Sequence, residues 1–198
     1  MLKRLFDIFA SFVGLIFLIP LFLCVSIWIK LDSNGPVFYR QNRVGRYGKL
    51  FAIHKFRTMK MDTESVSRLT IGDDCRITQP GKILRKFKID ELPQLIDVLI
   101  GTMSLVGPRP EVQEFIDCYP TEVRDKVLSV RPGITDRASI EMVDESSILA
   151  NYDDPKKAYI DKILPIKQDF YISYVNENSF LGDLNIIFST IIRIFNRN

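Results

Sequence analysis

The sequence contains little histidine and little cysteine, and its net charge is small. His54 is the single histidine among 198 residues, so a histidine-rich metal site or a mechanism that needs two histidines is excluded. The three cysteines are far apart and fit no zinc-ligand spacing, and their odd number indicates a reducing compartment without a disulfide framework. A net charge of +3 gives no support for nucleic-acid binding. Any acid, base or nucleophile must therefore come from carboxylates, lysines or hydroxyl groups.

One long apolar segment lies near the N-terminus. Residues 5–29 carry almost only apolar side chains, and about 20 such residues suffice to cross a bilayer as a helix. A signal peptide is disfavoured, because the apolar stretch is long and no small-residue cleavage site follows it. A buried core helix fits this length less well. The segment is therefore either one transmembrane helix or a re-entrant segment that enters and leaves the membrane on the same side.

Three features bear on that choice. Lys3, Arg4 and Lys30 place basic residues at both ends of the segment, and basic flanks favour the cytoplasmic side. Pro20 lies near the middle, where a proline removes a helix hydrogen bond at a cost of roughly 3 kcal/mol. Each arm beside it reaches only about half of a ~30 Å hydrocarbon core. These features favour re-entry, but proline-kinked spanning helices are common, so both interpretations stay open. Both place the rest of the chain in the cytoplasm.

The rest of the sequence predicts short strands followed by helices. Residues 37–39 and 50–59 are typical of strands, and the glycine turn at 45–48 joins them into an expected β-hairpin. Residues 61–80 are polar and predict a loop or a weak helix. Apolar spacing and capping residues predict helices over 90–101, 111–119, 155–176 with a break at Pro165, and 180–195. The last of these is amphipathic, so it either packs in the core or lies in the membrane interface, which we favour.

Two adjacent carboxylates form the sharpest chemical feature. Asp90 and Glu91 begin a predicted helix, with Asp90 as its N-cap and Pro93 in its first turn. Mg²⁺ prefers one or two carboxylates together with phosphate oxygens, and a carboxylate can also act as a nucleophile at phosphorus. Acidic residues in a first helical turn also simply complement the helix dipole, which is the commoner reason for their presence.

Basic residues in rigid loops strengthen the chemical interpretation. Arg109 lies between Pro108 and Pro110, and Arg131 precedes a Pro-Gly turn, so neither belongs to a regular helix. The planar guanidinium suits phosphate oxygens, and a stiff loop lowers the entropy lost on binding. Two more cations, Lys55 and Arg57, lie on the second predicted strand. Each of these side chains could instead pair with an acid or face solvent. His54 is interpreted as a hairpin side chain without a role.

The motifs together resemble a known family. In order they are an apolar segment with a central proline, KFRTM at 55–59, LRKFKIDELPQL at 84–95, SLVGPRPE at 104–111 and VRPGIT at 130–135. This order is similar to that of the small monotopic phosphoglycosyl transferases, the bacterial sugar transferase family. The resemblance covers nearly the whole chain, from Lys3 to about Phe195, in what looks like the family's minimal form.

The resemblance implies an α+β fold, mostly helical and compact with a small β-hairpin. A re-entrant helix-break-helix at 1–30, broken at Pro20, would carry a catalytic domain at 31–198 on the cytoplasmic face of the bacterial inner membrane, docked also on amphipathic interface helices. The implied reaction moves a phosphosugar from a UDP-sugar to polyprenyl (undecaprenyl) phosphate and releases UMP, with Mg²⁺. It would be the first membrane step of glycoconjugate assembly, and downstream glycosyltransferases are possible partners.

The resemblance also implies residue roles. The aspartate of the Asp-Glu pair, Asp90, would be the nucleophile, and Glu91 would help with the metal and with proton transfer. Arg85 matches the family arginine shortly before the pair, and Arg109 and Arg131 match those of the two proline loops. We assign substrate binding to these three arginines and to the remaining loop and strand residues, namely Lys55, Arg57 and Pro108.

The chain departs from the family pattern at three places. Ile19 precedes Pro20 where the family often has serine, and Asp136 stands where the family usually has the last glycine of RPGITG. A carboxylate near a phosphate-binding loop is expected to affect which donor is accepted. The region 139–155 is acidic and unlike the common asparagine-glycine-arginine version. We expect it to help set the choice of sugar, which exchange of this region between enzymes of different donor preference would test.

Two other functions remain open from the sequence. One is a hydrolase that acts on the same lipid diphosphates, with water in place of the lipid acceptor. The other is a non-catalytic, membrane-anchored adaptor whose cationic loops bind anionic lipids. The adaptor leaves the Asp-Glu pair and the two proline-framed arginines without a role, so the transferase is the leading interpretation.

Overall fold

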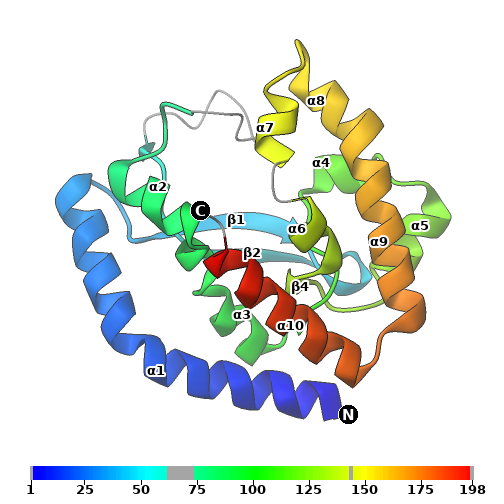
Figure 1. Ribbon diagram of the computed structural model, residues 1–198, viewed down its shortest axis with the longest axis horizontal. Coiled ribbons are helices and arrows are strands. Elements are labelled where there is room, and N and C mark those ends of the chain that lie inside the picture. Colours follow the sequence, from blue (N-terminus) through cyan, green and yellow to red (C-terminus); the bar gives the residue numbers. More distant parts are fainter. Residues whose placement is uncertain (1, 62–73, 143–144, 197–198) are drawn as a thin grey trace.

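A computed structural model describes residues 2–61, 74–142 and 145–196 of the chain. It confirms the expected α+β fold, in which helices surround a small antiparallel hairpin (Figure 1). Part of the predicted loop at 61–80, and two residues of the acidic region at 139–155, lie outside the described residues.

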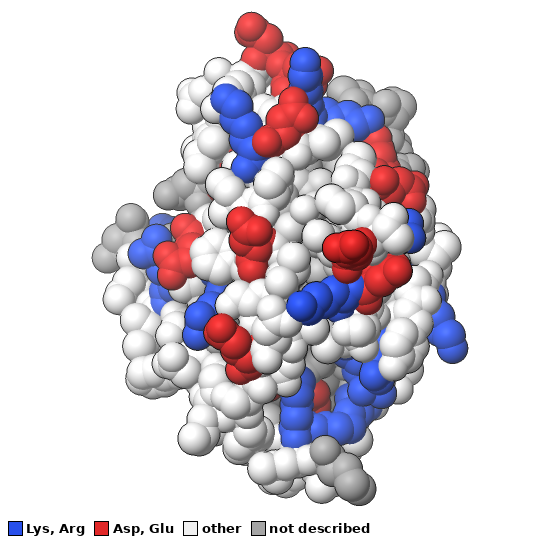
Figure 2. All heavy atoms as spheres, turned by 90° about the vertical axis from the view of Figure 1, so that its right-hand side faces the viewer, with Lys and Arg blue, Asp and Glu red and all other residues white. Residues whose placement is uncertain are grey.

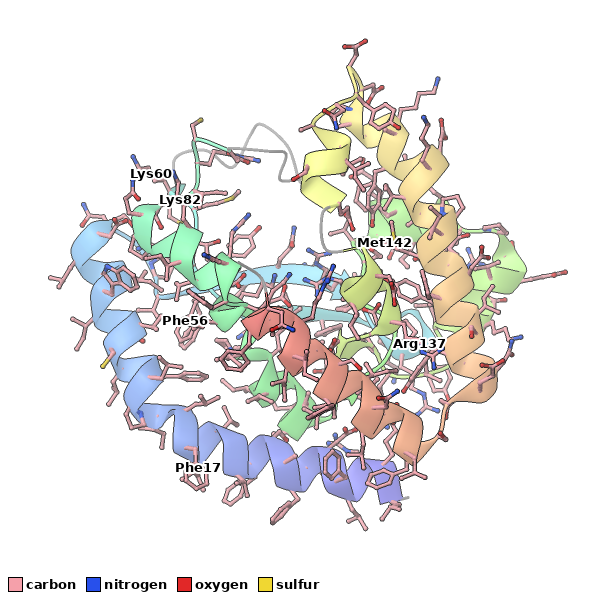
Figure 3. All side chains as sticks on the ribbon, in the orientation of Figure 1. Phe17, Phe56, Lys60, Lys82, Arg137 and Met142 are labelled. Carbon is pink, nitrogen blue, oxygen red and sulfur yellow. The ribbon has the colours of Figure 1, made fainter. Side chains whose placement is uncertain are left out.

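The apolar N-terminal segment forms one helix, α1 (Leu2–Asp32), with Pro20 inside it. Figure 1 shows α1 bending near its middle, so that it follows two sides of the domain. The structure therefore has a bend at the place where the sequence suggested a helix-break-helix. Pro20 has no backbone N–H and its ring crowds the preceding turn, but the helix accommodates both by curving and does not end there. Phe17 points away from the rest of the chain (Figure 3) and is 79% exposed.

The surface of α1 is mostly apolar and mostly uncovered. By its length and composition the helix could cross a membrane. Only 11% of its most apolar 18-residue stretch is buried within the domain. A large exposed apolar surface is typical of a segment that contacts a membrane and is rare on a protein surface that faces water. The chain thus associates with a membrane through α1.

The predicted hairpin is confirmed. Strands β1 (Phe38–Val44) and β2 (Leu50–Phe56) pair antiparallel, with Tyr39 opposite Lys55, and the short 3₁₀ turn η1 (Arg46–Gly48) joins them. Phe56 is 1% exposed and stacks on Phe38 on one side of β2, while Ile53 packs into a second apolar cluster with Val98 and Met103. Strand β2 therefore contributes to two apolar clusters, one shared with Val25 and Ile29 of α1 and one shared with α3.

Next to the hairpin lie α2 (Gln79–Lys86), the 3₁₀ turn η3 (Ile89–Glu91) and α3 (Gln94–Ile100). The sequence predicted one helix from Asp90 to Gly101 with Asp90 as its N-cap, and that part of the prediction is wrong. Lys88 adopts a left-handed backbone (φ 56°) and reverses the chain, so Asp90 and Glu91 lie inside η3. The predicted end at Gly101 (φ 101°) is confirmed.

A short parallel pair, β3 (Ser104–Val106) and β4 (Gly133–Thr135), was not predicted. It joins the two proline loops, since Gly107 donates a backbone hydrogen bond to Thr135 at 3.1 Å and Gly133 donates one to Pro108 at 3.0 Å. Both glycines are needed because the two backbones touch. A Cβ at Gly133 would lie 2.1 Å from the Gly107 nitrogen.

This contact makes Gly133→Ala strongly destabilising. The added methyl must push β3 and β4 apart, and overpacking of this kind costs about 3 kcal/mol, or roughly 6–12 °C in Tm for a chain of this size. Thermal unfolding of the purified protein in detergent measures the shift. Gly14→Ala is the matched control, because its Cβ meets Leu95 at an ordinary 3.4 Å. An equal Tm for Gly133→Ala and the wild type would contradict the packing described here.

The C-terminal half is a helical layer around the largest apolar cluster, which includes Phe115, Tyr159, Leu164 and Tyr171. The predicted helix 155–176 is confirmed, with its break as a π turn just before Pro165. The elements of this half are α4 (Gln113–Ile116), α5 (Thr121–Val127), α6 (Arg137–Glu141), α7 (Glu145–Leu149), α8 (Pro155–Ala158), the π turn η4 (Tyr159–Ile163), α9 (Leu164–Glu177) and α10 (Phe180–Phe195).

The predicted amphipathic helix is α10, with the bounds expected. Asp183 and Ile186 face the domain, while Leu181, Phe188 and Phe195 are 76%, 63% and 77% exposed. The face of the molecule turned away from the bend of α1 mixes acidic and basic side chains (Figure 2). A surface of mixed sign fits contact with solvent.

Candidate functional site

Asp90 and Glu91 are positioned by the turn that precedes α3. The left-handed Lys88 starts η3, and the fully buried Pro93 links η3 to α3. Although both are acidic, Asp90 is only 6% exposed and Glu91 only 7%. Burial of two adjacent carboxylates is costly unless cations or hydrogen bonds compensate. The surrounding cations therefore define the site.

Glu91 is fully engaged by two cations. Lys55 Nζ on β2 donates to Glu91 Oε1 at 2.8 Å. Arg109, in the loop after β3, donates to both carboxylate oxygens, with a 3.2 Å bond from Nη1 to Oε2 and a closer one from Nη2 to Oε1. Burial acts to raise the pKa of Glu91, but the charges of Arg109 and Lys55 outweigh it and hold the pKa well below its usual range. Glu91 is thus a buried, ionised anchor for two cations.

Asp90 is in a different state from its neighbour. Its Oδ2 lies 3.8 Å from Lys55 Nζ, beyond hydrogen-bond reach, and its buried Oδ1 has no hydrogen-bond partner in the described part of the chain. Burial raises the pKa of Asp90, and the negative charge of Glu91 adds to this rise, while Lys55 opposes it. A buried carboxylate oxygen without a partner is costly, so it marks a position where a ligand or a reacting atom is expected.

Arg85 approaches the same carboxylates from α2. Its Nε donates to the Thr58 hydroxyl at 2.9 Å. Burial lowers the pKa of Arg85, and the charges of Asp90 and Glu91 oppose that shift. The structure therefore gathers Lys55, Arg85 and Arg109 around the two carboxylates, from three elements that are far apart in sequence.

Two predicted substrate residues lie elsewhere. Arg57 is 2% exposed, and its two terminal nitrogens donate to the carbonyl groups of Ser33 at 2.7 Å and of Asn34, so it caps the end of α1. Arg131 donates from Nε to the Gly101 carbonyl at 2.8 Å, next to Arg4 at the far end of α3. Both arginines hold helix-terminal carbonyls, a role that their sequence neighbours could not reveal.

Pro108 and Asp136 shape the loops behind the site. Pro108 is buried, and its carbonyl accepts the hydrogen bond from Gly133 that fixes the Arg109 loop on β4. Asp136 caps α6 by accepting bonds from the Ser139 backbone at 2.9 Å and the Ser139 hydroxyl at 2.7 Å. Burial raises the pKa of Asp136, and the hydrogen bonds from Ser139 and the charge of Arg109 oppose that rise.

Sequence reasoning missed a buried polar network behind Arg109. Glu111 is 5% exposed; it accepts a bond from the Tyr159 hydroxyl at 2.7 Å and lies 3.9 Å from Arg43 and 3.8 Å from Lys167. Arg43 on β1 and Lys167 on α9 were not singled out, because each looks like a solvated charge in its own segment. The usable signal was Glu111 itself, an acid that directly follows the proline loop.

The residues at the site could supply some of the ligands of a divalent cation. The described residues hold no group of three or more histidine, cysteine, aspartate or glutamate side chains arranged for a metal. Asp90 offers an unpartnered oxygen, whereas both oxygens of Glu91 are already engaged. Mg²⁺ commonly takes one or two carboxylates and fills its other positions with water and substrate phosphate oxygens. The donor set thus fits Mg²⁺ bound together with a phosphorylated substrate.

Comparison with known proteins agrees with the motifs. A family model described as bacterial sugar transferase matches residues 1–197. The exopolysaccharide production protein PSS of Rhizobium leguminosarum bv. phaseoli is 38% identical over 96% of this chain and 94% of its own length.

Longer relatives match as well. A UDP-N-acetylgalactosamine-undecaprenyl-phosphate N-acetylgalactosaminephosphotransferase of Aeromonas hydrophila is 39% identical over 96% of this chain, and a UDP-glucose:undecaprenyl-phosphate glucose-1-phosphate transferase of Escherichia coli is 35% identical over 98%. This chain spans only 43% and 40% of their lengths. The match over residues 1–197, together with these identities, shows that the chain belongs to the bacterial sugar transferase family.

Proposed function

We propose that this chain is a phosphoglycosyl transferase that moves a phosphosugar from a UDP-sugar to a polyprenyl phosphate, such as undecaprenyl phosphate. The observation that carries the proposal is the buried, unpartnered Oδ1 of Asp90, next to Lys55 and to a Glu91 carboxylate that Lys55 and Arg109 hold. Relatives named for undecaprenyl-phosphate sugar phosphotransfer support the acceptor and the class of donor. Membrane polysaccharide assembly would consume the product.

The proposed reaction has two displacements at one phosphorus. The carboxylate of Asp90 attacks the phosphorus attached to the sugar, a P–O bond forms to Asp90, and the bond to the leaving UMP breaks. The acceptor phosphate oxygen then attacks the same phosphorus, and the bond to Asp90 breaks to give the polyprenyl diphosphate sugar. A covalent route lets a water-soluble donor and a lipid acceptor use one site in turn.

The cations of the site counteract the repulsion between the attacking carboxylate and the diphosphate. A carboxylate that approaches a diphosphate is repelled by its negative charges, and fixed positive groups lower that barrier. Lys55 and Arg109 hold Glu91 ionised, and Glu91 in turn fixes both cations at the turn that also carries Asp90. Mg²⁺, when bound, would polarise the phosphoryl oxygens. The unpartnered oxygen of Asp90 would be its protein ligand, and Glu91, whose two oxygens are engaged by Lys55 and Arg109, would hold those two cations in place.

We also propose that α1 is re-entrant and that the domain lies on the cytoplasmic face of the inner membrane. Both ends of α1 are bound to the same domain. Lys3 Nζ pairs with Asp183 at 2.6 Å, and Asp7 accepts a bond from the Ser104 hydroxyl at 2.8 Å. At the other end, Arg57 binds the Ser33 carbonyl. A straight helix of this length would separate its ends by about 46 Å, so one domain holding both ends favours a bent helix on one side.

Cysteine labelling tests this topology. With Cys24, Cys75 and Cys118 changed to serine, a single cysteine at Leu2 should resist a membrane-impermeant maleimide added to intact spheroplasts and react only after permeabilisation. A cysteine at Leu31 is the matched probe for the other end, since Leu31 is 81% exposed and Leu2 is 61% exposed. Labelling of Leu2→Cys in intact spheroplasts, with Leu31→Cys protected, would show a spanning helix instead.

A donor panel tests the reaction. We expect UMP release from at least one UDP-sugar when the wild-type protein, polyprenyl phosphate and Mg²⁺ are present together, with the sugar phosphate recovered on the lipid. Release of free sugar phosphate without lipid product would favour a hydrolase. If no donor in a broad panel gives UMP or lipid product, the proposed activity is wrong for this chain.

A further inference from the structure

The single histidine of the chain, to which the sequence assigned no role, is clamped to α3. His54 Nδ1 lies 2.7 Å from Asp97 Oδ1, and the His54 backbone N–H donates to Asp97 Oδ2 at 2.8 Å. Asp97 is 2% exposed and lies on α3, the helix that follows the Asp-Glu turn. One buried carboxylate therefore holds both the backbone edge of β2 and the side chain of the same residue.

The third member of this cluster fixes the tautomer of the imidazole. Arg40 Nη1 contacts His54 Nε2, and Arg40 Nη2 donates to the Ala52 carbonyl at 2.8 Å. A guanidinium has only donors, so Nε2 must accept and cannot carry a proton. The ring proton then sits on Nδ1 and is donated to Asp97. Arg40 and Asp97 are the charged side chains that contact His54 in the described part of the chain, and together they select the neutral Nδ1–H form.

The clamp lies next to the contact that joins β2 to the site. Lys55 follows His54 directly, and its Nζ lies 2.8 Å from Glu91 and 3.8 Å from Asp90. Neighbouring residues of a strand point to opposite sides, so His54 anchors the strand while Lys55 faces the carboxylates. Strand β2 is thus joined to η3 and α3 at two points, through His54 to Asp97 and through Lys55 to Glu91.

The long side chain of Lys55 depends on this support. Its Nζ donates to Glu91 at 2.8 Å and lies 3.8 Å from Asp90, so a small displacement of β2 would break the contact with Glu91. A flexible four-carbon side chain does not fix its own ammonium group. The position of the backbone of β2 relative to η3 therefore determines where the charge lies.

We infer that His54 is a positioning residue of the transferase: through Asp97 it fixes β2 on α3 so that the Lys55 ammonium stays against Glu91 and Asp90. This inference rests on the proposed function and adds a residue to it. Loss of the clamp acts on the charge next to the nucleophile, and the donor-binding arginines keep their places. The effect should therefore appear in kcat and leave the KM for the UDP-sugar nearly unchanged.

A double-mutant cycle separates positioning from mere structural support. With the full chain in lipid nanodiscs, His54→Ala should lower kcat about tenfold in the wild-type background but less than about twofold in a Lys55→Gln background, because residues that act through one another are not additive. A purely structural role predicts the same factor in both backgrounds and overturns the inference. Asn42→Ala, an exposed change on β1, is the matched control and should leave kcat unchanged.

A conservative variant provides a rescue. In His54→Asn the side-chain amide N–H stands close to the place of Nδ1–H and can still donate to Asp97, so kcat should return to within about threefold of the wild type. In His54→Gln the amide lies farther out and cannot make the same bond, so no rescue is expected. Equal activity of the asparagine and alanine variants would contradict the clamp.

Nuclear magnetic resonance tests the clamp without any assay. Because the chain has one histidine, a ¹⁵N-histidine sample gives one pair of ring signals. The wild type at neutral pH should show the neutral Nδ1–H tautomer, and Asp97→Ala should lose it. An Nε2–H tautomer or an imidazolium in the wild type would overturn the inference. If no donor in the panel gives UMP or lipid product while the expected tautomer is found, the proposed reaction is wrong. The hydrogen bond between His54 and Asp97 would then be confirmed, but His54 would have no positioning role in catalysis.

Discussion

Replacing Asp90 by asparagine should abolish UMP release, by at least about 10³-fold in kcat, while the fold is kept. The change replaces one carboxylate oxygen by an NH₂ group of similar size and removes the nucleophilic charge. Loss of a covalent nucleophile costs this much or more in enzymes that use one. Burial with an unpartnered Oδ1 also means that the wild-type side chain contributes little to stability. The measurement is initial UMP release with the donor identified from the panel.

The control for Asp90 must separate chemistry from folding. Tm of Asp90→Asn should equal or exceed that of the wild type, because a buried carboxylate whose pKa is raised by burial destabilises the folded state. Incubation of the wild type with labelled donor, without acceptor, should leave about one phosphosugar per chain on the protein, and Asp90→Asn should leave none. Near-normal UMP release by Asp90→Asn would remove Asp90 as nucleophile and leave the cations without a reacting partner.

The local part of this structure could be predicted from the sequence. The glycines at 45 and 48 and the alternating pattern of the flanking segments predicted the hairpin. The apolar face of residues 180–195 predicted α10, and Gly101 predicted the end of α3. Each depends on residues close in sequence, where spacing and backbone preference decide the outcome. The bend of α1 was half foreseen: Pro20 was recognised, but whether a proline bends or ends a helix depends on what the helix packs against.

The long-range part could not be predicted in the same way. Of the six side chains assigned to substrate, Lys55, Arg85 and Arg109 do gather at the carboxylates, whereas Arg57 and Arg131 bind helix-terminal carbonyls. Nothing local distinguishes Arg131 from Arg109, since both stand in proline loops. The difference comes from the β3–β4 pairing, which places the two loops side by side but turns one arginine to each end of α3.

His54 shows the same limit for a residue dismissed from the sequence. A lone histidine on a strand is most often a structural side chain, and its sequence neighbours gave no reason to think otherwise. Its partner Asp97 is 43 residues away, so the link to the site becomes visible only when β2 lies against α3. Function in this chain is thus distributed over contacts between elements, with few of its residues recognisable one at a time.

Arg109→Gln should be the most damaging change among the cations. It leaves Glu91 buried with Lys55 as its remaining partner, and removing one member of a buried ion pair costs about 3–5 kcal/mol. It also removes a cation held close to the attacked diphosphate, worth roughly 10²–10³ in kcat. We therefore expect both a large loss of Tm and a loss of UMP release, measured by thermal unfolding in detergent and by the donor assay.

A second substitution separates these two effects. Adding Glu91→Gln to Arg109→Gln removes a buried carboxylate that has lost one of its two cations, and it leaves Lys55 to pair with Asp90. Part of the lost stability should therefore return, because a buried pair costs more to break than to remove. Activity should not return, since neither the cation nor the anchor of Lys55 is restored. Arg109→Lys keeps the positive charge but cannot bond both oxygens of Glu91, so its Tm and its rate of UMP release should lie between those of the wild type and Arg109→Gln. Recovery of activity in the double variant would show that Arg109 serves only to neutralise Glu91, and the electrostatic role in catalysis would pass to Lys55 and Arg85.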